Sequence, residues 1–242
     1  MKRFFRVINI KCFKSAVLFV LSLFVCLEVH TALAAPSDDI VTTWKTDKSG
    51  TYNDNSITLP MLGGTYDVDW DGDGTFDQFG LSDSVTHDYG VAGTYTVRIA
   101  GNYDSISFAD GGDKEKILTI DQWGTNAWTS MSWAFAGAVN LTIPATDTPD
   151  FSEVTDMSYM FNGASSANPV TSGWKTSAVA SMLAMFQMAV TANPDTRNWD
   201  TSAVTDMSWM FFNASEANPD TTNWNTSAVS SMSSMFAYAT SA

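Results

Sequence analysis

The stretch NWDTSAVTDMSWMFFNA, residues 198–214, recurs through the C-terminal half of this chain with a period of 25 residues. The tryptophans Trp174, Trp199 and Trp224 mark the period. A valine, two methionines, a phenylalanine and an alanine follow each at fixed offsets: Val179, Val204, Val229; Met182, Met207, Met232; Met185, Met210, Met235; Phe186, Phe211, Phe236; Ala189, Ala214, Ala239. A period of about 20 to 50 residues is typical of stacked repeats, in which each unit buries its apolar face against its neighbours.

Weaker copies extend the array upstream. Met157 and Phe161 lie one period before the Met182 set, and Trp123 opens a more divergent copy that suits a capping unit. The array is therefore predicted over residues 120–242, as about five cycles of which the last is incomplete. The Trp and Met side chains are expected to be core, because one buried Trp removes roughly 150–250 Å² from water. Polar candidates for recognition between the repeated positions are Lys175, Arg197, Asp200, Glu216, Asp220 and Asn225.

The apolar spacing within each cycle predicts a short helix. Met207, Met210, Phe211 and Ala214 fall at i, i+3, i+4 and i+7, which is one face of a helix, and Asp206 is a natural capping residue. After an Asn-Pro step, residues 221–224 are expected to form a short strand. The predicted unit is strand, turn, helix and return, with the strands stacked into a parallel sheet.

This repeat resembles that of the BspA-like leucine-rich-repeat surface proteins. The resemblance covers residues 120–242 and rests on the pattern Trp-x-Thr-Ser-x-Val-x-x-Met-x-x-Met-Phe-x-x-Ala. It implies a leucine-rich-repeat-like α/β solenoid in a secreted or cell-surface protein, and some members of that family are adhesins.

A different period organises the residues before the array. Tyr66, Val68 and Trp70 alternate with aspartates, and Val97 and Ile99 alternate with Thr96 and Arg98, so half-buried strands of an antiparallel β-sandwich are expected over residues 35–119. The stretches YDVDWDGDGTFD and VTHDYGVAGTYTVRIAG, within residues 65–101, resemble the PKD domain, an immunoglobulin-like module of bacterial surface proteins. The expected fold class is therefore α+β and multidomain, a PKD-like sandwich followed by the solenoid.

One acidic loop carries the pattern of a metal site. Asp69, Asp71, Asp73 and Asp77 follow the spacing Asp-x-Asp-x-Asp-Gly-x-x-Asp, and alternate carboxylates in a tight loop can converge on a hard cation such as calcium. The pattern is incomplete as an EF-hand, since Gly80 stands where the bidentate Glu is needed. A solvated hairpin turn is the alternative reading of the same residues. His87 lies in the PKD-like signature, where a structural role is expected.

The N-terminal residues and the composition limit where the protein is expected to act and which partners it can bind. Residues 1–34 combine five basic residues, an apolar run and Ala32-Leu33-Ala34, the pattern of a secretory signal peptide. Its removal takes both cysteines and leaves His87 as the one histidine, which excludes disulfides and Cys/His zinc sites from the mature chain. Removing five basic residues and one acidic residue also shifts the formal net charge from −14 to −18, which disfavours nucleic acid as a partner.

These observations predict a secreted or cell-surface bacterial repeat protein that binds an extracellular protein or glycan. No catalytic residues are predicted, because no nucleophile and base stand at motif spacing and no phosphate-binding loop is present. The membrane is expected as a partner through the signal peptide alone, during export. A passive spacer within a larger surface assembly is the alternative, and glycoside hydrolysis by two facing carboxylates is a more distant one.

Overall fold

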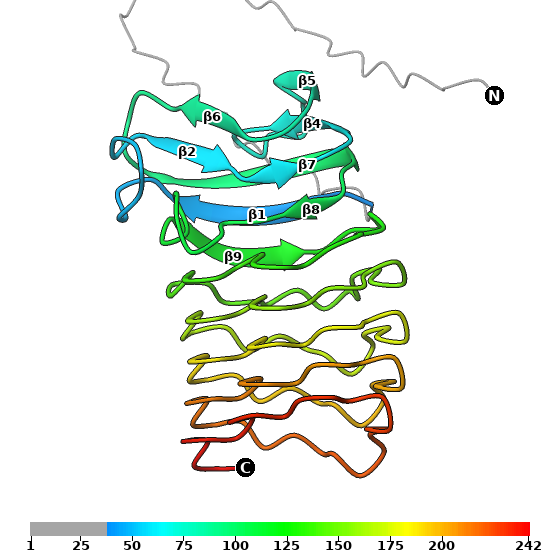
Figure 1. Ribbon diagram of the computed structural model, residues 1–242. Helices are drawn as coiled ribbons and strands as arrows, with labels where there is room; N and C mark the ends of the chain where they lie inside the picture. The colour runs from blue at the N-terminus through cyan, green and yellow to red at the C-terminus, as the bar shows by residue number, and fades with distance from the viewer. Residues whose placement is uncertain (1–37) are drawn as a thin grey trace, which may run out of the picture. The chain divides into compact units, whose positions relative to one another are not determined.

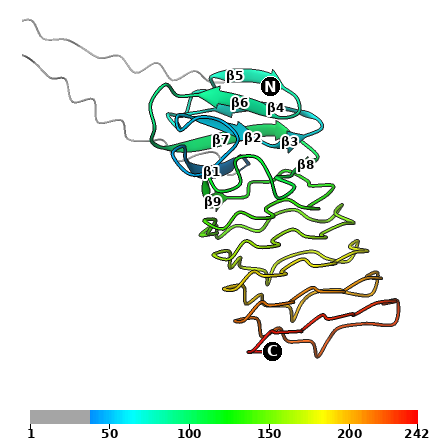
Figure 2. The ribbon, with the colours of Figure 1, turned by 60° about the vertical axis from the view of Figure 1, so that its left-hand side comes forward.

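The computed structural model describes residues 38–242, so the predicted signal peptide lies outside the described residues. This part of the chain contains nine β-strands and no helix, and the strands lie between residues 40 and 122 (Figure 1). The remainder is a succession of turns wound into stacked coils (Figures 1 and 2). Within residues 38–242 no helix of the length and apolarity needed to cross a membrane is found.

The strands form one larger antiparallel sheet and two small ribbons. The sheet has the order β5-β4-β7-β1-β9, with all neighbours antiparallel. The strands in that order are β5 (Gln78–Leu81), β4 (Thr65–Asp69), β7 (Thr94–Asn102), β1 (Ile40–Lys45) and β9 (Ile117–Gln122). The ribbons pair β2 (Ser56–Leu59) with β6 (Val85–Asp88), and β3 (Met61–Leu62) with β8 (Ser105–Ile106).

The alternation in the sequence correctly located two of these strands, β4 and β7. Tyr66 and Val68 in β4, and Val97 and Ile99 in β7, are all buried, as period-two patterning predicts for a half-covered sheet. The expectation for Arg98 was wrong, because its side chain is buried as well. It donates hydrogen bonds to Asp39 and Asp69, and its guanidinium lies 4.3 Å from the centre of the Phe76 ring. The loop after β4 therefore covers a face that the alternation had assigned to solvent.

The coils continue directly from the edge of the sheet. β9 pairs with β1 on one side, and on the other Ile120 and Thr142 are joined by a backbone hydrogen bond of 3.2 Å. A parallel bridge links Thr119 to Thr142. The buried apolar residues of the sheet and of the coils form one continuous cluster. The strand β9 is thus the last rung of the sheet and the first rung of the stack.

Stacking of successive coils is confirmed by contacts at the repeat period. Parallel bridges join Asp156 to Ser181, Ser181 to Asp206, and Asp206 to Ser231. Five phenylalanines, the first four of them buried, form a ladder with ring centroids 5.5–5.6 Å apart, namely Phe135, Phe161, Phe186, Phe211 and Phe236. Trp174 and Trp199 are buried and stack with an interplanar angle of 5°. The repeated residues are the core of the stack, as the sequence predicted, except that Met232 and Phe236 of the last coil are exposed.

The prediction of short helices was wrong. Each coil carries a turn segment, and the five are residues 131–139, 157–165, 182–190, 207–215 and 232–240. In the segment from residue 207, every second backbone N–H leaves the coil: Met207, Trp209, Phe211 and Asn213 donate to carbonyls of the next coil. Met210, Phe212 and Ala214 donate to the carbonyl three positions back, whereas an α-helix needs bonds four positions back.

Left-handed residues also interrupt each of these segments. Trp209 has φ 61° and Asn213 has φ 56°, and the equivalent residues of the other coils have φ between 52° and 72°. A left-handed residue breaks a right-handed helix, so the chain advances by linked turns. The pattern i, i+3, i+4, i+7 still buries Met207, Met210 and Phe211, because the turns return these side chains to the same side.

The fold class expected from the sequence is therefore corrected. The described chain is all-β with turns, and the leucine-rich-repeat-like α/β solenoid is contradicted by the lack of any helix between residues 38 and 242. The short strand expected at residues 221–224 is also missing, since these residues form a turn. The parallel bridges between coils fall instead on single residues, Asp206 and its equivalents Asp156, Ser181 and Ser231.

Candidate functional site

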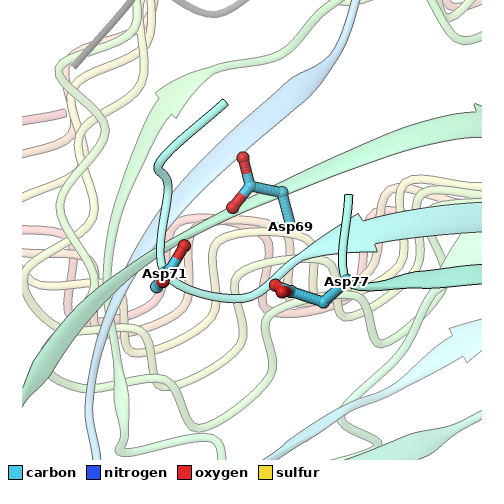
Figure 3. A group of neighbouring side chains, drawn as sticks. All are labelled: Asp69, Asp71 and Asp77. Atoms are coloured by element: carbon cyan, nitrogen blue, oxygen red, sulfur yellow. The ribbon is translucent and has the colours of Figure 1, made fainter. Parts of the chain in front are cut away.

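Three of the four aspartates predicted as metal ligands lie together in the loop that follows β4. Carboxylate oxygens of Asp69, Asp71 and Asp77 lie within 4.8 Å of one another (Figure 3). Asp73 is not part of this group; its Oδ1 accepts a hydrogen bond of 2.7 Å from the backbone N–H of Thr75. The loop thus brings together the first, second and fourth of the predicted residues.

Asp69 is the centre that holds this loop in shape. It is fully buried, Oδ1 accepts a hydrogen bond of 2.8 Å from Gly72 N–H, and Oδ2 accepts one of 2.9 Å from Gly74 N–H. The same Oδ2 accepts a hydrogen bond of 3.2 Å from Arg98 Nε. The Arg98 guanidinium and two backbone N–H groups therefore stabilise the buried negative charge of Asp69.

The other two carboxylates, of Asp71 and Asp77, are largely exposed, and each accepts one hydrogen bond from the backbone. Asp77 Oδ2 accepts a hydrogen bond of 2.8 Å from Trp70 N–H, and Asp71 Oδ1 accepts one of 3.2 Å from Asp73 N–H. Burial raises the pKa of Asp71, and the negative charges of the neighbouring aspartates raise it further. Calcium takes six to eight oxygen ligands, so these side chains alone supply a partial shell.

Calcium binding at this loop stays a prediction, and titration calorimetry of the full chain tests it. If calcium binds, heat should saturate at millimolar calcium and be lost in Asp71→Asn. That substitution leaves Asp69 and its hydrogen bonds in place. A flat titration of the wild-type chain would leave the loop as a hairpin turn.

His87 packs among aromatic rings beside the same loop. Its imidazole stacks on Trp70 with ring centroids 4.6 Å apart and contacts the edge of Tyr89 at 4.5 Å. Desolvation lowers the pKa of His87, while the nearby Asp77, Asp88 and Asp71 act in the opposite direction. The open cavity here measures about 410 Å³ and is lined by Trp70, Asp71, Asp77, Gln78, His87, Asp88 and Tyr89. The stacking gives His87 the structural role expected from the sequence.

A second feature lies on the coils and was missed by the sequence reasoning. The first left-handed position of each turn segment is occupied in successive coils by Trp133, Tyr159, Ala184, Trp209 and Ser234. Trp209 is 43% exposed, and Trp133 and Tyr159 are half-buried. A left-handed non-glycine residue costs about 1 kcal/mol or more. Large aromatic side chains therefore stand at strained positions on the outside of the stack.

These aromatic side chains meet one another across coils. Trp133 and Tyr159 stack with centroids 4.1 Å apart, and Trp209 stacks on Phe212 at 5.1 Å. Phe212 in turn meets the edge of Tyr238 of the next coil at 5.3 Å, and Tyr238 is 73% exposed. We call these five residues the aromatic file. Between its two clusters lies the third coil, where Ala184 takes the place of an aromatic ring.

The polar residues that the sequence nominated for recognition lie elsewhere. Lys175, Arg197 and Asp200 are exposed, but Asp200 Oδ1 accepts a hydrogen bond of 3.0 Å from Ser202 N–H. Asp220 and Asn225 accept from the backbone two residues on in the same way. The hydrogen bonds from Ser202 lower the pKa of Asp200. Asp200, Asp220 and Asn225 therefore cap turns of the coils.

The comparisons with known proteins concern the coils. Residues 129–242, just under half of the chain, match a family model described as "Mycoplasma protein of unknown function, DUF285". Neither the curated proteins nor the solved structures gave a match. The matched range contains all five turn segments, and the sheet lies before it.

Proposed function

We propose that this protein is an exported binding protein of the bacterial cell surface or its surroundings, which recognises an extracellular protein or glycan with the aromatic file. The observation that carries the proposal is the exposure of Trp209 and Tyr238 beside Phe212 on the outside of the coils. Soluble proteins rarely expose joined aromatic side chains without a partner. Trp and Tyr are also the residues that contribute most to binding energy at interfaces.

Export is proposed from the sequence alone. The signal-peptide pattern of residues 1–34 supports it, as do the resemblances of the repeat to BspA-like surface proteins and of residues 65–101 to PKD domains. The acidity of the chain favours solubility outside the cell and disfavours nucleic acid and anionic lipid as partners.

A panel experiment tests the proposal. The full chain without residues 1–34 is applied to immobilised matrix proteins, host glycoproteins and oligosaccharides, beside the variants Trp209→Ser and Arg197→Ser. Serine already stands at the equivalent position 234, so Trp209→Ser is expected to fold. Saturable binding that Trp209→Ser loses and Arg197→Ser keeps supports the proposal. No saturable binding to any member of the panel would favour a passive spacer.

A further inference from the structure

The turn segments that carry the aromatic file are uncharged in sequence, and the charged groups beside Gly137 of the first segment, Lys114 and Asp110, pair with each other. None of the five turn segments contains Asp, Glu, Lys, Arg or His. The other parts of residues 129–242 carry all eleven charged residues of that range: Asp147, Asp150, Glu153, Asp156, Lys175, Asp195, Arg197, Asp200, Asp206, Glu216 and Asp220. A ligand on the aromatic file therefore meets no charged side chain from the turn segments that it contacts. Charge complementarity then favours a neutral ligand.

Amide groups stand between the two clusters of the file. Asn162 Nδ2 donates a hydrogen bond of 2.6 Å to Gln187 Oε1. After this bond, Asn162 still has its side-chain carbonyl and one amide N–H for other partners. Gln187 still has both N–H groups of its side-chain amide. Both residues are half-buried, and the third coil carries the short Ala184 beside them. The gap between the clusters therefore offers neutral donors and acceptors, which match hydroxyl groups.

The arrangement along the stack fits an extended ligand. Trp133 with Tyr159 lies on the first two coils, and Trp209, Phe212 and Tyr238 lie on the fourth and fifth. The coil step is 5.5–5.6 Å between phenylalanine rings. A stable protein complex buries about 800 Å² on each side, and arginine, which is enriched at such interfaces, does not occur in the turn segments.

We infer that the ligand is a neutral glycan that lies along the stack, with sugar rings on the two aromatic clusters and hydroxyl groups on Asn162 and Gln187. Sugar rings present apolar C–H faces, which pack on aromatic rings, and neutral hydroxyls, which pair with amides. This inference rests on the proposed function and narrows it to one class of ligand.

Titration with defined oligosaccharides tests the inference. Neutral gluco-, galacto- and N-acetylglucosamine oligosaccharides of two to six sugars are titrated into the full chain without residues 1–34, at low and high salt. Hyaluronate and heparin oligosaccharides serve as acidic counterparts. We expect affinity for a neutral series to rise with chain length and to be independent of salt. Trp209→Ser, Trp133→Ala and Gln187→Ala should each weaken it at least tenfold, and Arg197→Ser should leave it unchanged.

Each other outcome overturns the inference, and the outcomes separate it from the proposed function. Failure of every neutral oligosaccharide, or salt-dependent binding of acidic ones alone, overturns the neutral glycan. If a protein of the panel binds and Trp209→Ser abolishes that binding, the proposed function stands and the glycan does not. If no ligand depends on Trp209, both fail. Thermal melts of the variants that match the wild type exclude unfolding as the cause.

Discussion

At the scale of single residues, buried charges are the strongest local determinants of the sheet region. Asp113 and Lys116 are both fully buried and lie 3.4 Å apart. Asp113 accepts hydrogen bonds from the backbone N–H groups of Thr51 and Thr58, and Lys116 Nζ donates to the carbonyls of Asn53 and Ser56. Two side chains thus fix the loop that precedes β2.

Removing one charge of this pair should be strongly destabilising. Lys116→Met is expected to lower the free energy of unfolding by about 3–5 kcal/mol, because it leaves a buried carboxylate without a counter-charge. Urea denaturation measures the change. Lys114→Met is the matched control, since Lys114 and Asp110 form a partly exposed pair and should lose less than about 1 kcal/mol. Equal losses in the two variants would contradict the role given to Lys116.

His87 should make stability depend on pH. Burial lowers its pKa below the ordinary 6.5, so the unfolded chain binds the proton more tightly than the native protein. The contribution of neutral His87 is complete above pH 6.5 and is lost as the pH falls below it. Relative to His87→Phe, which keeps a ring on Trp70, the wild type should lose stability from pH 7.5 to pH 5. A constant difference across that range would show that the pKa is not lowered.

At the scale of elements, the turn segments show where apolar spacing misleads. Met207, Met210, Phe211 and Ala214 are buried in the way that a helix face would be, so the core residues could be predicted from the sequence. The element could not, because linked turns return side chains to one side as a helix does. The signal against a helix was the glycine or asparagine at Gly137, Gly163 and Asn213, which now proves to be a left-handed position.

Two variants at Trp209 distinguish linked turns from a helix by the sign of one difference. In a helix, glycine is about 1 kcal/mol less stable than alanine. At a left-handed position glycine avoids a steric cost of about 1–2 kcal/mol, which exceeds its larger entropy loss. We therefore expect Trp209→Gly to unfold at higher urea than Trp209→Ala. The opposite order would mean that residues 207–214 are helical.

The sequence also identified a capping residue in the array, Asp206, but this residue begins a turn and not a helix. Asp206 was expected to cap a helix, and its Oδ1 does accept a backbone hydrogen bond, 2.8 Å from Ser208 N–H. The bond is to the second residue on, as in an Asx turn. Asp156 makes the same contact with Ser158. The residue type of Asp206 predicted that its side chain accepts a backbone hydrogen bond. Whether a helix or a turn segment follows depends on the hydrogen bonds to the neighbouring coil.

At the scale of the whole described chain, the repeat period is the part that the sequence predicts best. A 25-residue period requires neighbours in register, and parallel bridges at that period follow from it. The aromatic file could not be predicted, because its members fall between the repeated core positions, and the first left-handed position varies between Trp, Tyr, Ala and Ser. Exposure at those positions depends on backbone angles that residue identity alone does not specify.

The acidic loop from Asp69 to Asp77 also shows what residue spacing alone cannot predict. Spacing predicted that four aspartates converge, and three of them, Asp69, Asp71 and Asp77, do. It could not show that Asp69 is bonded to Arg98, which lies 29 residues further along and was expected in solvent. Contacts between distant parts of the sheet decide which carboxylates are available to a ligand.

The central claim is that recognition takes place on the aromatic file and not on the charged edges of the coils. Calorimetry of the ligand with highest affinity measures it directly, with the double variant Trp133→Ala/Trp209→Ser and the double variant Lys175→Ala/Arg197→Ser compared with wild type. We expect the first to lose at least a hundredfold in affinity and the second to stay within twofold. The reverse result, with affinity lost on removing Lys175 and Arg197 and kept without the two tryptophans, would contradict the claim.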